Sequence, residues 1–230
     1  MFALIRRIAW SMYGRYAWDQ NQNYKVTESV RARILAALNE NRRSTAENVL
    51  DAGCGTGNYA ASIRVAGFQV LAVDYARGMI KKARKKFGNQ DSLRFEKVDL
   101  SKAFPFPDST FNHIVCVSVL QSVPDPVFIL QEFRRILKPE GTLVITHTPR
   151  PDGHQMAVDQ DGSGRPGTSA KKGNFSGILL RAKSAAERRG FSNYWALGDL
   201  KEILTRSGLT IIKTEFVCSI IIIMAKRTGK

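Results

Sequence analysis

The chain reads Val49-Leu50-Asp51-Ala52-Gly53-Cys54-Gly55-Thr56-Gly57 after its first predicted helix, so that a short apolar run leads into three closely spaced glycines. The apolar residues predict a buried strand, and the glycines predict a tight turn that opens a helix from Gly57. Glycine lacks Cβ, so its backbone takes positive φ and lets a ligand lie directly against it. The first N–H groups of the following helix are free to bind that ligand. The segment therefore predicts a ligand-binding turn.

On either side of this turn, short β-branched runs alternate with helical patterns. Strands are predicted at 48–51, 69–74, 93–99, 113–119 and 142–146, and helices at 27–38, from 57, at 78–87 and at 127–137. The chain closes with a helix at 198–207 and two strands, 209–216 and 219–225, which are near enough in sequence to form an antiparallel hairpin. Residues 220–223 are apolar on both faces, which favours an interior strand. The alternation predicts an α/β fold, a mostly parallel sheet with helices on both faces.

Length and composition indicate one domain, 1–230. A chain of 230 residues that is 43% apolar can bury one core. Its three cysteines are far apart, which favours neither a disulfide framework nor a zinc site, and no metal is expected. The longest apolar run is too short to cross a bilayer, and no signal peptide is recognisable. We therefore expect a soluble, cytoplasmic protein.

The net charge of +15 predicts attraction to anionic partners: nucleic acid, anionic lipid, or a phosphorylated or carboxylated small molecule. Much of the excess lies in the helix predicted at 78–87, whose basic residues are interpreted as its solvated face: Lys81, Lys82, Arg84, Lys85 and Lys86. The apolar residues of that helix are expected to face the core: Met79, Ile80, Ala83 and Phe87.

Three carboxylates follow successive predicted strands. Asp51 precedes the first glycine by two residues, and a negative charge there favours a cationic amino-acid group over a pyrophosphate. Asp74 lies 74 − 53 = 21 residues beyond Gly53, the spacing at which a carboxylate accepts hydrogen bonds from a ribose diol. Asp99 is placed to accept a hydrogen bond from an exocyclic amine, and Leu100 to pack on a purine.

These motifs resemble the successive motifs of class I S-adenosylmethionine (SAM) dependent methyltransferases, and the resemblance covers about 48–146. Segments 111–125 and 132–143 are similar to the fourth-strand and fifth-strand motifs of the methyltransferase type 11 group, which includes ubiquinone and menaquinone biosynthesis methyltransferases. The resemblance implies a Rossmann-like, seven-stranded sheet, SAM as cofactor and S-adenosylhomocysteine as product. The cofactor-binding residues it implies are Tyr16, Asp51, Gly53, Cys54, Gly55, Gly57, Asp74, Tyr75, Asp99, Leu100 and Val117.

Two positions depart from the family pattern. Asn112 stands where members often carry Asp, and its place at a strand start favours a structural role. Gln121-Ser122 stands where members often carry a His pair. Gln121 is expected near the methionine end of the cofactor, where its amide is still able to hydrogen-bond.

Two variable regions flank the motifs. Residues 1–40 are expected to form N-terminal cap helices, in which the aromatic segment 8–19 resembles the family's cofactor-covering segment and Tyr16 is the favoured residue. Two other interpretations of the N-terminal segment remain: a helix packed on the body, or an amphipathic stretch on a membrane surface. Residues 149–195, whose first part is rich in Gly, Pro and Ser, are interpreted as a mobile lid. The acceptor's determinants are expected in residues 1–23 and 149–195.

Methyl transfer from a sulfonium depends mainly on alignment and desolvation of the nucleophile, and a base is needed only where the accepting atom loses a proton. His147, expected at the carboxyl edge of the sheet, is the candidate base, with a structural loop histidine as the alternative. We expect methylation of a small organic acceptor, anionic or hydrophobic in the manner of a quinone precursor or lipid. The alternatives are an RNA or tRNA methyltransferase, favoured by the charge, and a non-catalytic SAM-binding protein.

Overall fold

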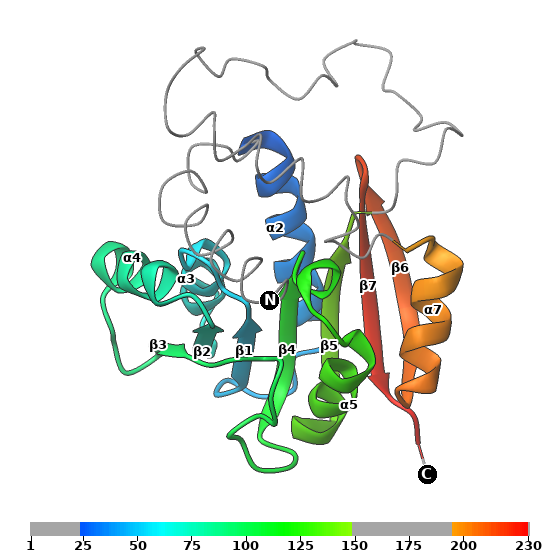
Figure 1. The fold of residues 1–230 in the computed structure, drawn as a ribbon. Helices are drawn as coiled ribbons and strands as arrows, with labels where there is room; N and C mark the ends of the chain where they lie inside the picture. The colour runs from blue at the N-terminus through cyan, green and yellow to red at the C-terminus, as the bar shows by residue number, and fades with distance from the viewer. Residues whose placement is uncertain (1–23, 149–194, 230) are drawn as a thin grey trace, which may run out of the picture.

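The computed structural model describes residues 24–148 and 195–229, which form one seven-stranded sheet with helices on both sides (Figure 1). The helices are α2 (Tyr24–Glu40), α3 (Asn58–Val65), α4 (Arg77–Phe87), α5 (Pro126–Ile136) and α7 (Leu197–Arg206), with a 3₁₀ turn η2 (Leu120–Ser122). The strands are β1 (Asn48–Ala52), β2 (Gln69–Asp74), β3 (Leu93–Lys97), β4 (Phe111–Val117), β5 (Leu137–His147), β6 (Leu209–Val217) and β7 (Ile220–Arg227). Within this part of the chain, no helix combines the length and apolar character needed to cross a membrane.

The strand order is β3-β2-β1-β4-β5-β7-β6. Strands β1 to β5 pair in parallel, whereas β7 runs antiparallel to both β5 and β6. The predicted parallel sheet, its terminal hairpin and the interior position of 220–223 are therefore confirmed. The chain proceeds outward from β1 to β3 and then crosses back to β4, so the strand order reverses between β1 and β4. In open α/β sheets, ligands bind outside the carboxyl ends of the strands at such a reversal.

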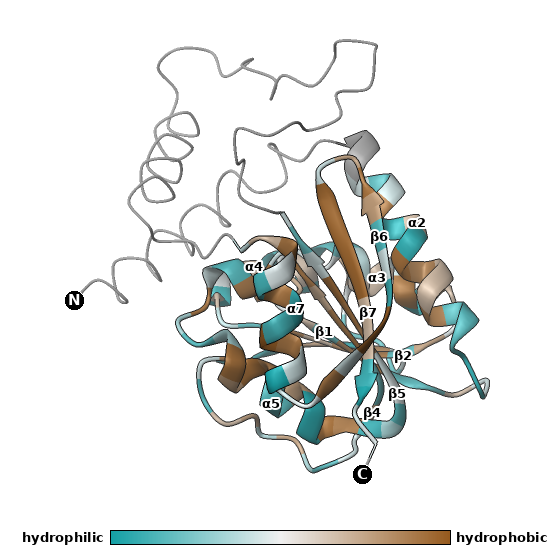
Figure 2. Ribbon diagram, turned by 90° about the vertical axis from the view of Figure 1, so that its right-hand side faces the viewer, coloured by the Kyte–Doolittle hydropathy of each residue, from teal (hydrophilic) through white to brown (hydrophobic). Residues whose placement is uncertain are grey.

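Alternating side chains divide the core between the two faces of the sheet. On β1, Val49 packs with α2, α3 and α4, whereas Leu50 packs with α5 and α7. On β4, Val115 faces the first layer, and its neighbours Ile114 and Cys116 face the second. Figure 2 shows the apolar residues concentrated in the sheet and on the helix sides that meet it. The period of two along buried strands thus gives the sheet one core layer on each face.

Helix α2 lies on the sheet, where Val30, Ile34 and Leu38 are fully buried. The rest of the predicted cap, residues 1–23, lies outside the described residues, and so does 149–194 of the predicted lid. Helix α4 buries Met79, Ile80 and Ala83 and half-buries Phe87, as its pattern predicted.

Several predicted boundaries were wrong by a few residues. β5 begins at Leu137 rather than 142, because the chain leaves α5 in extended conformation and Leu137 pairs with Phe111. The extra residues bulge out of β5, because its partners advance from Leu137 to Thr142 while β4 advances only from Phe111 to His113. Gly141 is needed in this bulge because a Cβ would lie 2.7 Å from the Asn112 carbonyl oxygen. β4 ends at Val117 rather than 119, since Ser118 adopts a φ of 54°.

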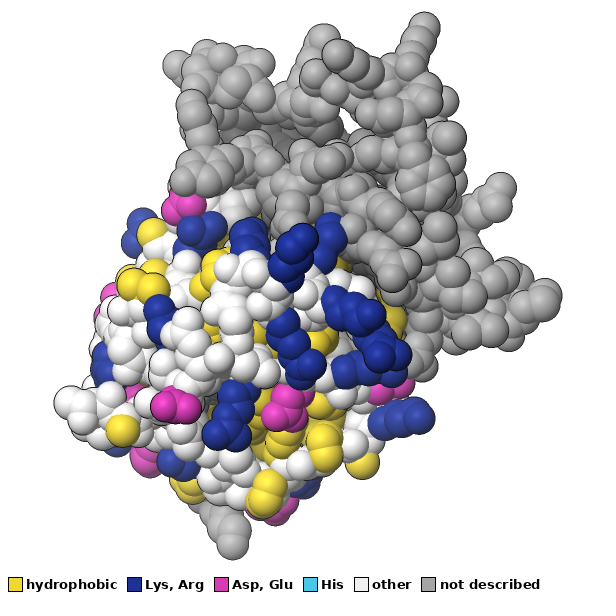
Figure 3. All heavy atoms as spheres, turned by 90° about the vertical axis from the view of Figure 1, so that its left-hand side faces the viewer, with side chains coloured by type: hydrophobic (Ala, Val, Ile, Leu, Met, Phe, Trp, Pro, Cys, Tyr) yellow, Lys and Arg dark blue, Asp and Glu magenta, His cyan; other side chains and the backbone are white. Residues whose placement is uncertain are grey.

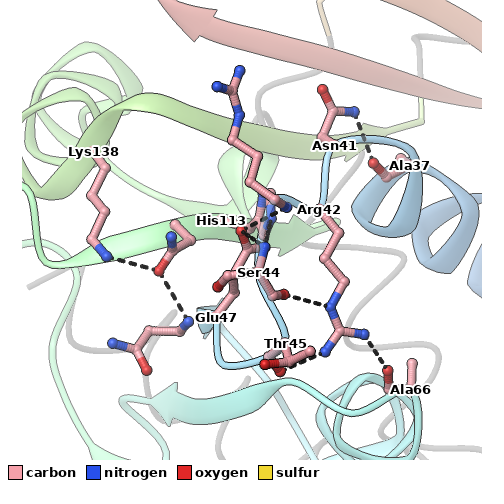
Figure 4. A network of polar contacts seen from close by, with 12 residues as sticks. Ala37, Asn41, Arg42, Ser44, Thr45, Glu47, Ala66, His113 and Lys138 are labelled. Carbon is pink, nitrogen blue, oxygen red and sulfur yellow. Dashed lines mark hydrogen bonds and ion pairs between the residues drawn. The ribbon is translucent and has the colours of Figure 1, made fainter.

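A polar network closes the amino edge of the sheet (Figure 4). Glu47, 1% exposed, accepts backbone hydrogen bonds from Arg43 and Ser44 with one carboxylate oxygen and lies 2.8 Å from His113 Nε2 with the other. Burial alone would raise the pKa of Glu47, but the Arg43 N–H and His113 hold it below its usual value. The Asn112 side-chain oxygen accepts from Asn48 N and Lys138 Nζ, in keeping with its predicted structural role.

Arg42 forms a second polar network beside the first. Its guanidinium donates to the carbonyl oxygens of Ser44, Thr45, Ala66 and Gly67 and lies 4.3 Å from the centroid of the Phe68 ring. One arginine thereby joins the loop before β1 to the loop before β2. The two networks hold the amino ends of neighbouring strands in register.

Replacing Glu47 by Ala should lower the free energy of unfolding by about 3 kcal/mol, because two backbone N–H groups and the buried His113 lose their acceptor. Urea denaturation followed by circular dichroism measures the change. Glu140→Ala is the matched control, since Glu140 forms an exposed ion pair with Arg43 and should cost about 0.5 kcal/mol or less. Equal losses in the two variants would contradict the structural role of Glu47.

Candidate functional site

The glycine turn lies at the carboxyl end of β1 and is bound to β2 by its backbone. Gly53 N and Cys54 N both donate to the Val73 carbonyl oxygen, at 2.8 and 2.9 Å. Gly53, Gly55 and Gly57 have φ values of 81°, 56° and 85°, a conformation that side-chain-bearing residues rarely adopt. A Cβ on Gly57 would also lie 2.7 Å from the Phe95 ring. The glycine spacing is thus required by the turn and by the close approach of Phe95 of β3 to Gly57.

Asp51 is buried directly before this turn. Its side chain is 1% exposed, and Oδ2 finds no hydrogen-bond partner among the residues that the structure describes. Burial and the negative charge of Asp74 raise the pKa of Asp51 to about 7, against a hydrogen bond from the Ala60 backbone that lowers it. A buried carboxylate oxygen without a donor is unfavourable by itself and is stabilised by a bound cation. This is the group that the sequence predicted to face a cationic amino-acid moiety.

Asp74 ends β2 and fixes two neighbouring backbones. Oδ2 accepts from Gly55 N at 3.0 Å, and Oδ1 accepts from Ala76 N, at the start of α4, at 2.8 Å. Burial raises the pKa of Asp74 to about 6, although these two N–H groups act in the opposite direction. Each carboxylate oxygen carries two lone pairs, so both remain able to accept a ligand hydroxyl.

The other predicted site residues follow the same edge of the sheet. Asp99 comes after β3, and its Oδ1 accepts from both the backbone and the hydroxyl of Ser101, which is a turn contact. Leu100 is 6% exposed within the α5–α7 side of the core. Cys54 is buried, and burial raises the pKa of its thiol far above the ordinary value. Tyr75 and Val117 are half-buried at the ends of β2 and β4. Tyr16 lies outside the described residues.

The exit from β4 meets the glycine turn, a contact that the sequence did not predict. Ser118 N donates to Thr146 Oγ1 at 3.0 Å, and the positive φ of Ser118 turns the chain out of the sheet. Val119 then lies so close to Gly53 that a Cβ there would be 2.3 Å from Val119 Cγ2. The valine-rich run around Ser118 predicted a strand here. The positive φ of Ser118, which ends that strand, cannot be predicted from any residue pattern in the run.

Two further polar atoms follow in η2. Gln121 Oε1 and Ser122 Oγ are buried and have no hydrogen-bond partner in the described ranges. Both stand after β4, beside the strand-order reversal. Gln121 was predicted here from the family resemblance, whereas Ser122 was noted only as a departure.

His147 is the last residue of β5 and pairs with Ile221 of β7. It is 1% exposed, its Nε2 lies 3.1 Å from the Trp195 carbonyl oxygen, and the two rings are 5.5 Å apart. A carbonyl only accepts, so Nε2 carries the proton and Nδ1 has the free lone pair. Nδ1 has no partner among residues 24–148 and 195–229. Burial lowers the pKa of His147, so the ring is neutral near pH 7. This contact of Trp195 was not predicted, because Trp195 was included only as the last residue of the predicted lid and belongs to no motif.

These groups stand at the carboxyl ends of β1, β2 and β5. They comprise the glycine turn, a buried carboxylate suited to a cation, a second carboxylate suited to hydroxyls, and a neutral histidine. Such a set binds a nucleoside-like molecule with a positively charged end and leaves a proton acceptor on the adjoining strand.

Comparison with known proteins agrees with this geometry. Residues 50–145 match the family model described as a methyltransferase domain. The chain is 32% identical over 105 residues to a demethylmenaquinone methyltransferase of Clavibacter sepedonicus, an alignment covering 46% of this chain and 42% of that protein. It is 31% identical over 146 residues to a ubiquinone biosynthesis O-methyltransferase of Xanthomonas euvesicatoria pv. vesicatoria, covering 61% and 60%. The chain therefore spans about two fifths to three fifths of these relatives.

A solved structure extends the similarity to the whole fold. Magnesium protoporphyrin IX methyltransferase from Synechocystis PCC 6803, solved with bound SAM, superposes with a TM-score of 0.61 at 16% identity, covering 88% of this chain and 80% of that chain. The strand order, the glycine turn and these matches lead to one conclusion: residues 50–145 match a methyltransferase domain, in a chain whose fold is that of class I, SAM-dependent methyltransferases.

Proposed function

We propose that this protein transfers a methyl group from SAM to a small organic acceptor of quinone-like character. The observation that carries the proposal is the unpartnered, buried Oδ2 of Asp51 beside the glycine turn, with Asp74 on the neighbouring strand. The names of the two curated relatives, both quinone-pathway methyltransferases, support the acceptor class. The cytoplasmic location expected from the sequence is part of this proposal.

The residues present fit SAM. Asp51 would hold the cationic amino end, the backbone of Gly53 to Gly57 would lie against the ligand, and Asp74 would accept from the ribose hydroxyls. Asp99 and Leu100 are proposed for the adenine, with Tyr75 and Val117 along the wall and Tyr16 as a covering residue. When bound, SAM supplies an electrophilic methyl group on a positively charged sulfur.

The chain's own residues would prepare the acceptor. Because the Trp195 carbonyl holds the Nε2 proton of His147, Nδ1 is the atom able to take a proton from a phenol or enol as its oxygen becomes nucleophilic. Gln121 and Ser122 offer hydrogen-bonding groups one strand away. Positioning and exclusion of water by these buried groups supply most of the rate.

Nucleic acid is the competing acceptor, favoured by the charge of +15. Turnover of a quinone or phenol acceptor without any nucleic acid supports the small-molecule proposal. Methylation seen only with RNA would overturn it.

Asp74→Ala should abolish measurable SAM binding in isothermal titration, because the variant loses both the ribose acceptor and the contact that fixes Gly55. Asp51→Asn should weaken binding by about tenfold or more, since it removes a buried charge facing a cation. Asp91→Asn, an exposed carboxylate of the loop before β3, is the matched control and should bind like the wild type. Unchanged affinity in Asp74→Ala would refute the assigned pocket.

SAM affinity should rise several-fold between pH 6 and about 7.5, because Asp51 titrates near 7 and only its ionised form attracts the cationic end. The sign follows from the raised pKa: acid protonates Asp51 and removes the attraction. Titrations across this range in wild type and Asp51→Asn test it. The variant should show a flat profile near pH 7, and a parallel rise in both proteins would assign the effect to another group.

His147→Gln should lower kcat by about 10²-fold or more while leaving the Kd for SAM within about twofold, if the acceptor loses its proton to Nδ1. The acid limb of the wild-type pH–rate profile should lie below pH 6.5 as a consequence of the lowered pKa and should vanish in the variant. A thermal melt separates this from unfolding. A variant that is stable and retains kcat shows that His147 is structural.

A further inference from the structure

The structure contains a strongly basic surface that the methyl-transfer site does not use. Between 77 and 102 the chain has nine Lys and Arg against three Asp and Glu, a net +6 of the total +15. Helix α4 contributes six of these cations and no acidic residue. Figure 3 shows this side of the molecule, where dark blue side chains outnumber magenta ones. We call the exposed row Arg77, Lys81 and Lys85 the α4 basic row.

The three residues of the α4 basic row follow one another at four-residue spacing, so they lie in line along one side of the helix. All three are exposed, and none has a carboxylate partner within the described part of the chain. Like charges at this spacing repel and destabilise a helix. Arg84 and Lys86 differ, because Arg84 donates to the Phe95 carbonyl oxygen and Lys86 to Asn58.

The helix dipole explains only part of this pattern. Cations in the last turn, Arg84 to Lys86, interact favourably with the carboxyl end of α4. Arg77 at the amino end is placed unfavourably, and the first turn has no acidic residue to balance it. The repulsion along the row and the position of Arg77 at the amino end are unfavourable for folding, which is consistent with selection for an anionic partner.

The shape and composition of the surface select the kind of partner. The apolar side of α4 is buried, so the charged side chains on its outer side are all cationic. Of the large hydrophobic side chains exposed in the described ranges, Val65, Ile212 and Phe216, none belongs to α4 or β3 and only one is aromatic. Single-stranded nucleic acid is bound through stacked aromatic residues in a groove, whereas an anionic bilayer attracts lysine and arginine without either feature.

We propose that the α4 basic row binds the surface of an anionic phospholipid bilayer. This rests on the proposed function in one respect: a quinone-like acceptor partitions into membranes, so an enzyme acting on it benefits from adsorption there. Arg77 follows Asp74 by three residues, so the row begins beside the cofactor pocket. Adsorption through α4 therefore brings the pocket end of the molecule to the lipid headgroups.

Co-sedimentation of the full chain with vesicles tests the proposal, using phosphatidylcholine alone and phosphatidylcholine with about one third phosphatidylglycerol. The wild type should bind the anionic vesicles only, and binding should disappear in high salt. The triple variant Arg77→Gln, Lys81→Gln, Lys85→Gln should bind these vesicles more weakly by about tenfold or more. It should also melt at a higher temperature in low salt, because the repulsion is removed.

The matched control is Arg33→Gln, Lys201→Gln, Arg206→Gln, which removes the same charge from exposed positions on α2 and α7. Equal loss of vesicle binding in both triple variants would overturn the proposal, because net charge rather than the row would then be responsible. Unimpaired vesicle binding in the α4 variant, with loss of binding to a single-stranded RNA oligonucleotide, would also overturn it in favour of RNA. SAM titration of each variant keeps this test separate from the proposed function, since none of the substituted residues is among those proposed to bind SAM.

Discussion

The Val73 carbonyl oxygen accepts two hydrogen bonds from the glycine turn, and the arrangement of the site depends on this contact. It holds Gly53 and Cys54 against β2, so the turn cannot move away from the sheet. Asp74 completes the attachment, because it binds Gly55 on one side and the start of α4 on the other. One strand end thereby positions the turn, α3 and α4 together. A ligand at this edge meets a backbone that is already organised.

The two edges of the sheet show opposite electrostatic arrangements. At the amino edge both oxygens of Glu47 have partners, although His113 Nδ1 has none in the described ranges. At the carboxyl edge Asp51 Oδ2 and His147 Nδ1 are buried without a partner in the same ranges. Burying unsatisfied polar atoms is unfavourable for stability, and it becomes favourable once a ligand supplies the missing donors and charge. Stability and binding are thus assigned to different ends of the same strands.

Helix α4 shows a similar division, between a side that stabilises the fold and a side proposed to bind a partner. The apolar side of α4 belongs to the core, whereas its outer side carries the α4 basic row, which has no carboxylate partner in the described ranges. The basic run was correctly predicted to be solvated, but its three-residue row emerged only when the helix limits and the partners of Arg84 and Lys86 were known. Asp74 accepts a hydrogen bond from Ala76 N directly before α4, so the row begins next to the proposed cofactor site.

Local sequence pattern was sufficient to predict the strands, the helices, the glycine turn and the carboxylates that follow the strands. It was sufficient because apolar periodicity and positive-φ glycines are properties of short segments. It also predicted the hairpin and the interior strand 220–223. The boundaries of β4 and β5 were missed, since the bulge and the positive φ of Ser118 arise from pairing between distant segments. Pairing across the sheet also decided which polar atoms are buried together. Three features of the site require residues that are far apart in the chain to come together in the buried interior. They are the contact of Val119 with Gly53, the hydrogen bond of His147 with the Trp195 carbonyl, and the raised pKa of Asp51.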